Sequence, residues 1–592
     1  MKAKKLLAVV LALMLIVSLF AACGGSGNKD NSTPNSTPAS TPADDGGDDA
    51  SEPADNGDDA GEPSDTGTGT EVNEHGYPVS ATEKGKVNQQ TYPLVDEKIT
   101  LDFWYPNGSS MGELADFNDG EFWQWYEELT NVHINFIVPA VGTEGESFQL
   151  LFASDDFPDM IFHSGTGSQG YRTGQDAAIE DGYIADMMEH LDWAPNYVSW
   201  LNYYYDDYGK AAKSDSGKMY GMFGVWDTMA ENAVADQGIA IRKDFLDKVG
   251  MEVPTTYDEW ETVLTAFKDE LGVSAPFYTS KYGIDYGEFM AGYDTAPYWY
   301  VRDGKVSYGP MDDQYKEYLE LLHSWWEKGL LDPDFATRQS TGVTADNDMM
   351  LNDQVGSLID YGTRMANAYV TRGATNPDFF LVAAPQPVRS DKPVTPAFRN
   401  YGSGSDRMHG QIISFDAEGE HLETAIRWND GFYAEDIFLN ANFGLESEEG
   451  IVWYKAEDGH RIGDYDFRYS NPDGISSATV LVQFWTKNPP VRVESSQIEQ
   501  MPANQSIAYT VWSENEPTMF LPNRVTMTAD ENTEYASYYS DIEAYVQEAN
   551  AQFIMGQRSL DEYDAYRDTL KNMGIESCQE LYQAAYDRYL AR

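Results

Sequence analysis

The alternation of hydrophobic and polar positions is clearest between residues 238 and 270. Gly238–Ile241 is a short apolar run that contains two β-branched residues, which favours a buried strand. Arg242–Val249 predicts a short helix that ends at Gly250, the residue type that most often takes the left-handed position after a helix. Pro254 keeps the chain from resuming a helix at once. The stretch therefore predicts a strand followed by a short helix.

A second helix follows, with a clear start signal. Thr256 and Glu259 have the spacing of a capping box, in which each side chain accepts a hydrogen bond from the other residue's backbone. Apolar residues then recur at helical spacing, at Trp260, Val263, Leu264 and Phe267. One face of this helix is therefore expected to pack against a core.

The preceding part of the chain predicts strands that alternate with helices. The predicted strands are 98–104 and 133–138, and the predicted helices are 122–129 and 148–153. Residues 156–162 resemble a strand segment of a known protein family and are taken as the third strand. This order is typical of a parallel sheet with crossover helices. Ligands of such open sheets bind beyond the carboxyl ends of the strands, so residues 104–108 and 163–167 are candidate binding loops.

Similar patterns continue to the end of the sequence. Helices are predicted at 179–191, 315–328 and 540–590, and strands at 353–359 and 379–384. A chain of 592 residues exceeds the size at which a single core keeps growing. We therefore expect an α/β protein with two or more lobes.

The first 22 residues have the pattern of a secretion signal: lysines, an apolar run from Leu6 to Phe20, and small residues. Leu19–Gly25 resembles a bacterial lipoprotein box, which implies that the Cys23 thiol is lipidated and that Cys23 begins the mature protein. The expected location is the extracellular face of the cell membrane, reached through this lipid anchor. Residues 24–90 are rich in Ser, Thr, Pro, Gly and Asp and predict a disordered acidic tether.

The composition excludes several classes of function. A net charge of −59 makes nucleic acid an unsuitable partner. The two cysteines, Cys23 and Cys578, form no disulfide framework, and the eight histidines follow no metal-binding spacing, so no metal or cofactor is expected. The sequence has no G-x-S-x-G motif, P-loop or G-x-G-x-x-G motif after a strand, so we assign no catalytic residues.

The run IRKDFLDKVGMEVPTTYDEW at 241–260 resembles a segment of bacterial extracellular solute-binding proteins of the family 1 type. These lipoprotein receptors deliver oligosaccharides to ABC importers, and further segments after Lys98 resemble them in the same order. The resemblance implies a bilobal type II periplasmic-binding-protein fold with two parallel-sheet lobes. It places one lobe at about 91–236 and 400–450, the other at about 237–390 and 451–592, and the crossings near Asp236 and Pro387–Tyr401.

The same resemblance implies a monomer that captures a carbohydrate between closing lobes and presents it to separate permease and ATPase subunits. Sugar recognition needs flat aromatic rings and hydrogen-bonding groups at their rim. The loops at the predicted cleft supply both, which gives the candidate ligand-binding residues Trp104, Asn107, His163, Trp226, Trp299, Tyr361, Arg364, Tyr401 and Arg407. For each residue taken alone, a role in packing is an equal alternative.

Other functions remain open at this point. A receptor for peptides or other small solutes would share the two-lobe architecture, although the 13% of aromatic residues favours carbohydrate. A secreted glycoside hydrolase would need two carboxylates, and 98 acidic residues allow many such pairs. A surface adhesin would usually show internal repeats, and none is found.

Overall fold

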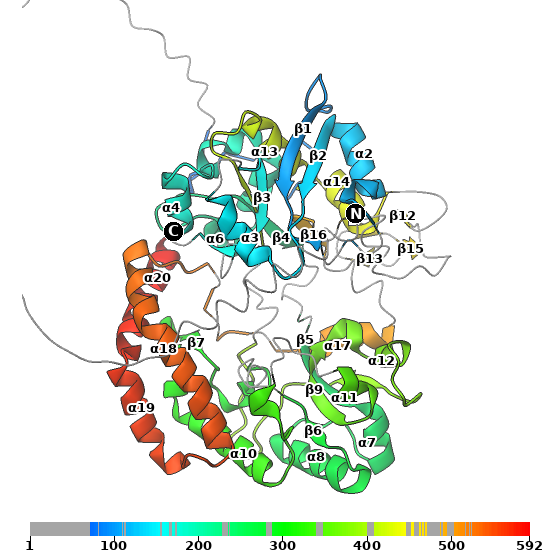
Figure 1. Ribbon diagram of the computed structural model, residues 1–592, viewed down its shortest axis with the longest axis vertical. Helices are drawn as coiled ribbons and strands as arrows, with labels where there is room; N and C mark the ends of the chain where they lie inside the picture. The colour runs from blue at the N-terminus through cyan, green and yellow to red at the C-terminus, as the bar shows by residue number, and fades with distance from the viewer. Residues whose placement is uncertain are drawn as a thin grey trace, which may run out of the picture. The chain divides into compact units, whose positions relative to one another are not determined.

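The computed structural model describes residues 71–592, apart from 81, 109–110, 112–113, 154–156, 165–168, 172–173, 228–234, 236, 280–286, 339–346, 400–407, 446–451, 455–460, 463–464, 467, 471–485, 487–488, 494–502, 516, 520 and 523. The signal segment, Cys23 and the tether up to residue 70 therefore lie outside the described residues. The described residues belong to one compact unit, Gly69–Arg592. Two main sheets within this unit define an N-lobe and a C-lobe (Figure 1).

The N-lobe is built on a six-stranded sheet in the order β16-β4-β11-β3-β1-β2. Its strands are β1 (Ile99–Trp104), β2 (Val132–Ile137), β3 (Met160–His163), β4 (Met222–Asp227), β11 (Met408–Phe415) and β16 (Val491–Val493). β1 is parallel to β2 and β3, as the sequence predicts, and β16 is parallel to β4. β11 is antiparallel to both of its neighbours, so the sheet is mixed and not wholly parallel.

Helices cover this sheet: α2 (Glu121–Thr130), α3 (Glu144–Leu151), α4 (Gln175–Glu180), α5 (Pro195–Tyr203), α6 (Lys210–Ala212), α13 (Leu422–Gly431) and α14 (Glu435–Phe443). The helix predicted at 179–191 is not formed as such. α4 ends at Glu180, Gly182 takes a positive φ of 78°, and the Asp186 carboxylate accepts hydrogen bonds from the backbone of Met188 and Met219. Asp186 thus stabilises a turn in place of a helix.

The C-lobe sheet has the order β10-β5-β9-β6. Its strands are β5 (Gln237–Arg242), β6 (Ala275–Phe277), β9 (Val355–Tyr361) and β10 (Leu381–Ala383), and only the β6–β9 pair is parallel. The C-lobe helices are α7 (Lys243–Val249), α8 (Tyr257–Leu271), α10 (Asp313–Glu327), α11 (Asn347–Leu351), α12 (Ala368–Thr371), α17 (Ala503–Trp512), α18 (Ala529–Ile554), α19 (Tyr563–Asn572) and α20 (Ile575–Ala591).

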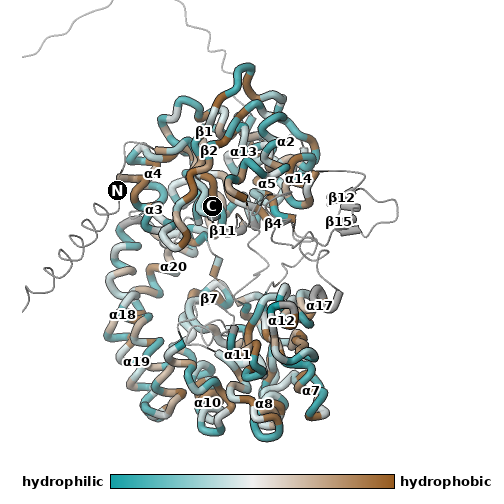
Figure 2. Tube along the Cα trace, turned by 45° about the vertical axis from the view of Figure 1, so that its right-hand side comes forward, coloured by the Kyte–Doolittle hydropathy of each residue, from teal (hydrophilic) through white to brown (hydrophobic). Residues whose placement is uncertain are grey.

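The predicted start of α8 is confirmed. Thr256 and Glu259 form the expected capping box, and Gly250 ends α7 with a φ of 68°. The apolar face of α8 is buried, and the alternating colour of α8 in Figure 2 follows this pattern. None of the helices in the described part of the chain combines the length and the apolar character needed to cross a bilayer.

Three short strand pairs accompany the main sheets: β7 (Trp299–Arg302) with β8 (Lys305–Tyr308), β12 (Val452–Tyr454) with β15 (Arg468–Ser470), and β13 (Arg461–Ile462) with β14 (Tyr465–Asp466). The sequence analysis left open whether Tyr298–Tyr300 is a strand with alternating faces. β7 shows this alternation, because Trp299 and Tyr300 are both buried but in different hydrophobic clusters.

Residues 71–90, which the sequence assigns to the tether, pack onto the N-lobe. Tyr77 is fully buried, and its hydroxyl donates to the backbone carbonyl of Gly209 at 2.6 Å. The Gly85 amide donates to the Ser199 hydroxyl at 2.7 Å. A Cβ on Gly85 would lie 1.9 Å from the carbonyl oxygen of Tyr433, so only glycine fits there. Residues 71–90 therefore belong to the folded N-lobe and not to the tether.

The chain passes between the lobes more often than the two crossings expected from the sequence. Phe398 still packs in a C-lobe cluster with Ala291 and Tyr300, so the second crossing lies within residues 400–407. β16 then belongs to the N-lobe sheet, and α17 to a C-lobe cluster. Val525 packs against the N-lobe core before α18 enters the C-lobe core. Residues 451–592 are therefore shared by both lobes.

Candidate functional site

The strand ends of both main sheets lie next to the segment where the chain first crosses between the lobes. In the N-lobe, β1, β2, β3, β4 and β16 run in one direction, so their carboxyl ends share one edge. In the C-lobe, Gln237 at the start of β5 pairs with Tyr361 at the end of β9. Residues 228–236 connect the end of β4 to the start of β5, so a short link joins the two edges. This is where an open α/β sheet binds its ligand.

The N-lobe edge carries an aromatic ring stacked on a guanidinium group. Trp226 lies near the end of β4, and Arg492 is its register partner in β16. The Arg492 guanidinium lies 4.6 Å from the centre of the Trp226 ring, and both side chains are partly exposed. A flat ring whose orientation is held by a stacked cation is suited to bind the apolar face of a sugar.

The C-lobe edge carries Tyr361 and Arg364, with a buried carboxylate behind them. The Asp360 carboxylate accepts hydrogen bonds from the Tyr369 hydroxyl at 2.7 Å and from the Tyr361 amide at 2.8 Å. It lies 3.5 Å from Nη1 of Arg364, whose guanidinium is 5.4 Å from the centre of the Tyr361 ring. Asp360 and the ring thus orient the Arg364 guanidinium, which is partly exposed.

Burial raises the pKa of Asp360 to about 6, against the lowering effect of Arg364 and of the hydrogen bond from Tyr369. The ion pair with Arg364 is therefore strongest above this pH, where the carboxyl is ionised. Gly362, between Tyr361 and Arg364, lies against the Tyr509 ring of α17, where a Cβ would come within 2.2 Å of a ring carbon. The short turn after β9 is thus fixed on two sides.

Three residues predicted to contact the ligand are core side chains in this structure. Trp104 is 1% exposed and packs with Phe148 and Ile161. His163 is buried, and its Nε2 is 2.8 Å from the Ser414 hydroxyl. Burial, together with the positive charge of Arg524, lowers the pKa of His163 to about 3, so the ring is neutral at physiological pH.

Trp299 is the third of these residues. Its indole N–H donates to the Tyr535 hydroxyl at 3.0 Å, and its ring packs against Tyr308 and Tyr582 in the C-lobe core. The sequence signals an aromatic triplet there but not which helices cover it. We leave Trp104, His163 and Trp299 out of the site proposed below.

The remaining predicted residues divide into two groups. Asn107 is partly exposed in the loop after β1, and its side chain is hydrogen-bonded to the buried Tyr105. Tyr401 and Arg407 lie outside the described residues. The structure adds Arg492, which the sequence analysis missed. Its only sequence signal is the short alternating run Val491-Arg492-Val493 after two prolines.

The described residues contain no group of three or more His, Cys, Asp or Glu side chains arranged to hold a metal ion. A small cavity of about 10 Å³ lies in the N-lobe core, among residues that include Phe103, Trp123 and Trp428, and has room for about one water molecule. A hollow of about 480 Å³ lies between residues 73–83 and α5. Neither is lined by a predicted ligand-binding residue.

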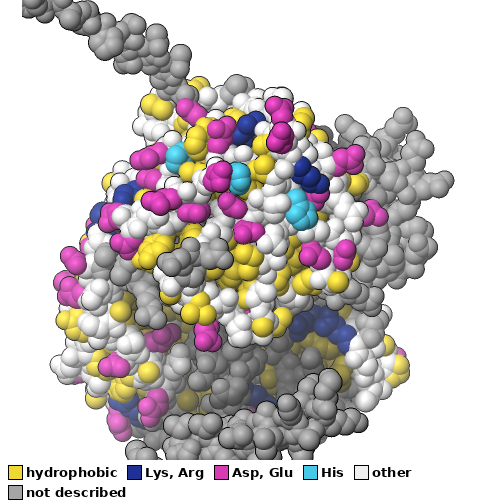
Figure 3. All heavy atoms as spheres, turned by 45° about the horizontal axis from the view of Figure 1, so that its top comes forward, with side chains coloured by type: hydrophobic (Ala, Val, Ile, Leu, Met, Phe, Trp, Pro, Cys, Tyr) yellow, Lys and Arg dark blue, Asp and Glu magenta, His cyan; other side chains and the backbone are white. Residues whose placement is uncertain are grey.

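The site includes positively charged side chains, although the chain as a whole is strongly acidic. Acidic residues number 98 against 39 basic ones, and Figure 3 shows acidic side chains spread widely over the face that it displays. The side chains placed at the two sheet edges include two arginines, Arg364 and Arg492. Guanidinium groups there can donate several hydrogen bonds to hydroxyl or carboxylate oxygens of a ligand.

Comparisons with known proteins agree with this architecture. No family model matches the chain. The fructooligosaccharide ABC transporter substrate-binding protein FusA of Streptococcus pneumoniae is 23% identical over 540 residues, which cover 86% of this chain and 93% of FusA. The polygalacturonan/rhamnogalacturonan-binding protein YtcQ of Bacillus subtilis is 26% identical over 227 residues, which cover 36% of this chain and 42% of YtcQ.

Solved structures show the same fold. An extracellular solute-binding protein from Bifidobacterium longum subsp. infantis superposes with a TM-score of 0.65 at 19% identity, covering 83% of this chain and 99% of that protein. FusA in complex with kestose gives a TM-score of 0.63 at 20% identity, covering 83% of this chain and all of FusA. The resemblance to extracellular solute-binding proteins and the bilobal α/β fold are therefore confirmed.

Proposed function

We propose that the chain is the extracellular substrate-binding protein of an ABC importer and that it binds an oligosaccharide between its two lobes. The observation that carries this proposal is the similarity to FusA over most of both chains. The stacked pair of Trp226 and Arg492, and the pair of Tyr361 and Arg364, support it because they lie on the two sheet edges that residues 228–236 connect.

In the proposed mechanism, the Trp226 ring packs on the face of a sugar ring, and Arg364 donates hydrogen bonds to hydroxyl or carboxylate oxygens from the other lobe. A ligand that contacts both lobes binds the closed form more tightly than the open form, and this difference drives closure. No covalent step is needed. The closed protein then presents a surface made from both lobes to a membrane permease, which a separate ATPase subunit powers.

The proposal includes attachment to the membrane through a lipid on Cys23. The acidic segment between Cys23 and about residue 71 would hold the folded body away from the bilayer, because its like charges repel one another and keep it extended. This shortened tether replaces the 24–90 segment expected from the sequence. In this proposal the protein binds no nucleic acid and acts as a monomer.

Calorimetric titration of the full-length chain with fructooligosaccharides, other oligosaccharides and peptides tests the proposed function. Trp226→Ala should weaken oligosaccharide binding by about tenfold, because the stacking of one ring contributes about 1–1.5 kcal/mol. Trp193→Ala is the matched control, since Trp193 is a partly exposed N-lobe tryptophan stacked on His190. Binding of peptides alone would favour the peptide-receptor alternative, and release of shortened sugars would favour a glycoside hydrolase.

A further inference from the structure

α20 belongs to the cores of both lobes. Ile575 and Cys578, in its first turn, are buried in the C-lobe core. Tyr586 packs against both cores, and Tyr589 is buried in the N-lobe core. A helix of 17 residues is about 25 Å long, so one rigid element extends from one core into the other. Figure 1 shows α20 reaching the N-lobe from the layer of α18 and α19.

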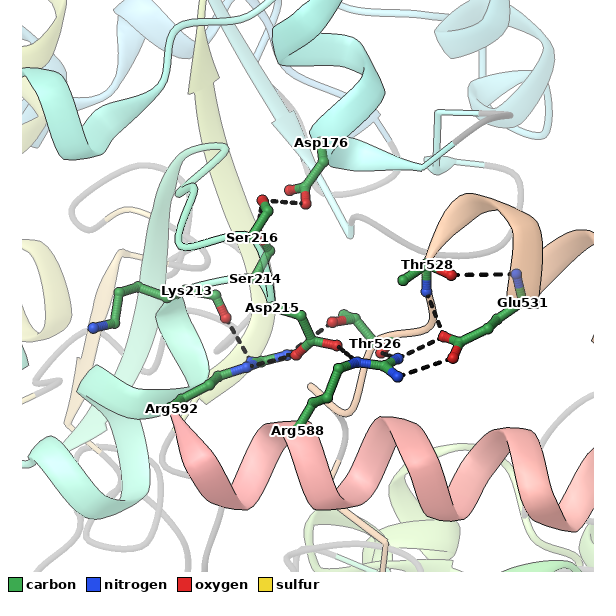
Figure 4. A network of polar contacts seen from close by, with 10 residues as sticks. All are labelled: Asp176, Lys213, Ser214, Asp215, Ser216, Thr526, Thr528, Glu531, Arg588 and Arg592. Atoms are coloured by element: carbon green, nitrogen blue, oxygen red, sulfur yellow. Dashed lines mark hydrogen bonds and ion pairs between the residues drawn. The ribbon is translucent and has the colours of Figure 1, made fainter.

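The end of α20 is held by a cluster of charged residues, which we call the Asp215 cluster: Asp215, Glu531, Arg588 and Arg592 (Figure 4). Asp215 lies in the N-lobe loop between α6 and β4. Its two carboxylate oxygens accept hydrogen bonds from Arg588 Nε at 2.7 Å and from Arg592 Nε at 2.9 Å. One carboxylate of the N-lobe thus binds two guanidinium groups presented by α20.

Arg588 also binds the start of α18. Both terminal nitrogens of Arg588 donate to the Glu531 carboxylate, at 2.9 and 2.5 Å. Glu531 is the acidic member of the capping box that begins α18. Burial would raise the pKa of Glu531, but the hydrogen bonds from Arg588 and from the Thr528 amide hold it below its usual value. The first turn of α18, the last turn of α20 and the N-lobe loop therefore meet at one point.

Two further hydrogen bonds from Arg592 strengthen this junction. Arg592 Nη1 donates to the Lys213 carbonyl at 2.5 Å, and Arg592 Nη2 donates to the Thr526 hydroxyl at 2.8 Å. The Arg592 side chain is 5% exposed and that of Asp215 is 13% exposed. Charged groups at this depth are costly unless they stay paired, so the cluster resists separation more than a surface ion pair would.

We propose that the Asp215 cluster is the pivot of lobe movement, with Asp215 as a positioning residue that fixes the end of α20 in the N-lobe. Elsewhere the chain passes between the lobes in the connections from β4 to β5 and from Phe398 to β11. α20 is a helix held in both cores, so opening and closing must proceed as rotations that keep its bonded end in place. The proposal depends on the two-lobe fold and not on which ligand binds.

Distances between spin labels on the two lobes test this proposal on the full-length chain without any ligand. Labels are attached at Glu128→Cys on α2 and Glu270→Cys on α8, both exposed, in a Cys23→Ser background in which Cys578 is buried. Asp215→Asn should broaden the interlobe distance distribution and shift it to longer values. Asp564→Asn is the matched control, because it removes the same charge from an exposed pair with Arg567 on α19.

A comparison of single and double mutants distinguishes the loss of the Asp215 contacts from a general loss of stability. If Asp215 acts through the arginines, Arg592→Gln should broaden the distribution in the parent but add little in the Asp215→Asn background. Arg588→Gln, which leaves the contacts of Arg592 in place, replaces Asp215→Asn if that variant does not fold. A folded Asp215→Asn or Arg588→Gln protein with the distance distribution of the parent would overturn the proposal, whatever the protein binds.

Discussion

Arg242, in the middle of the IRKD run, provides the sharpest test of the fold. Its side chain is fully buried, and its guanidinium lies 3.8 Å from the ring centres of both Phe245 and Phe379. Nε and Nη2 donate to the two oxygens of Asp244 at 2.8 and 2.7 Å, and Nη2 also donates to Asp353 at 2.6 Å. Arg242 thus connects β5, α7, the start of β9 and the segment before β10.

Replacing Arg242 by methionine keeps an unbranched stem but removes the charge. Asp353 is partly exposed and can be hydrated, whereas Asp244 is 8% exposed. Without Arg242, Asp244 would keep, among the described residues, only Lys248 at 3.8 Å and the hydrogen bonds from Asn376 and the Phe380 amide. Breaking a buried ion pair by removing one partner costs about 3–5 kcal/mol. The two ring contacts are lost as well, so we expect Arg242→Met to lower the free energy of unfolding of the C-lobe by about 4 kcal/mol.

Hydrogen exchange of the backbone amides of β5 and β9 measures this loss, because buried strands exchange through opening of the surrounding lobe. Lys243→Met is the control: it removes the same charge from the next residue, whose partner Asp247 is exposed, and should change stability by less than about 0.5 kcal/mol. If Arg242→Met altered the exchange of these strands no more than Lys243→Met does, the assignment of the IRKD arginine to C-lobe stability would be wrong.

Two further predictions concern Asp360 and Cys23. The folded-state pKa of Asp360, about 6, lies above its unfolded value, so its contribution to stability is present at low pH and is lost as the pH rises through about 6. The side chain introduced by Asp360→Asn cannot ionise, so the variant does not lose this stability. Urea titrations should therefore show the variant gaining stability relative to the parent between about pH 4 and 6. A stability difference that stays constant over this range would contradict the raised pKa of Asp360. Cys23→Ser should release the protein from bacterial membranes into the medium, and equal retention of parent and variant after fractionation would refute lipid attachment at this residue.

The sequence by itself determined most of the local structure. The strand at 238–241, the capping box at Thr256 and the left-handed residue Gly250 are all observed, because each depends on interactions within a few residues. The resemblance carried by the IRKD run also gave the bilobal fold correctly. The helix predicted at 179–191 was wrong because Asp186 binds the backbone of Met219, a contact 33 positions away that no local pattern reveals.

Only the tertiary structure decided which aromatic and charged side chains are available to a ligand. Trp104, Trp226 and Trp299 all lie at or near the end of a strand, but whether a ring is covered depends on elements that come from elsewhere in the chain. α3 packs on Trp104 and α18 on Trp299, whereas Trp226 contacts Arg492. The same holds for residues 71–90, which have little apolar surface of their own but bury Tyr77 in a core already formed by the N-lobe. Whether a side chain is buried depends on the partners that long-range contacts bring to it, and the spacing of residues within one segment does not reveal those partners.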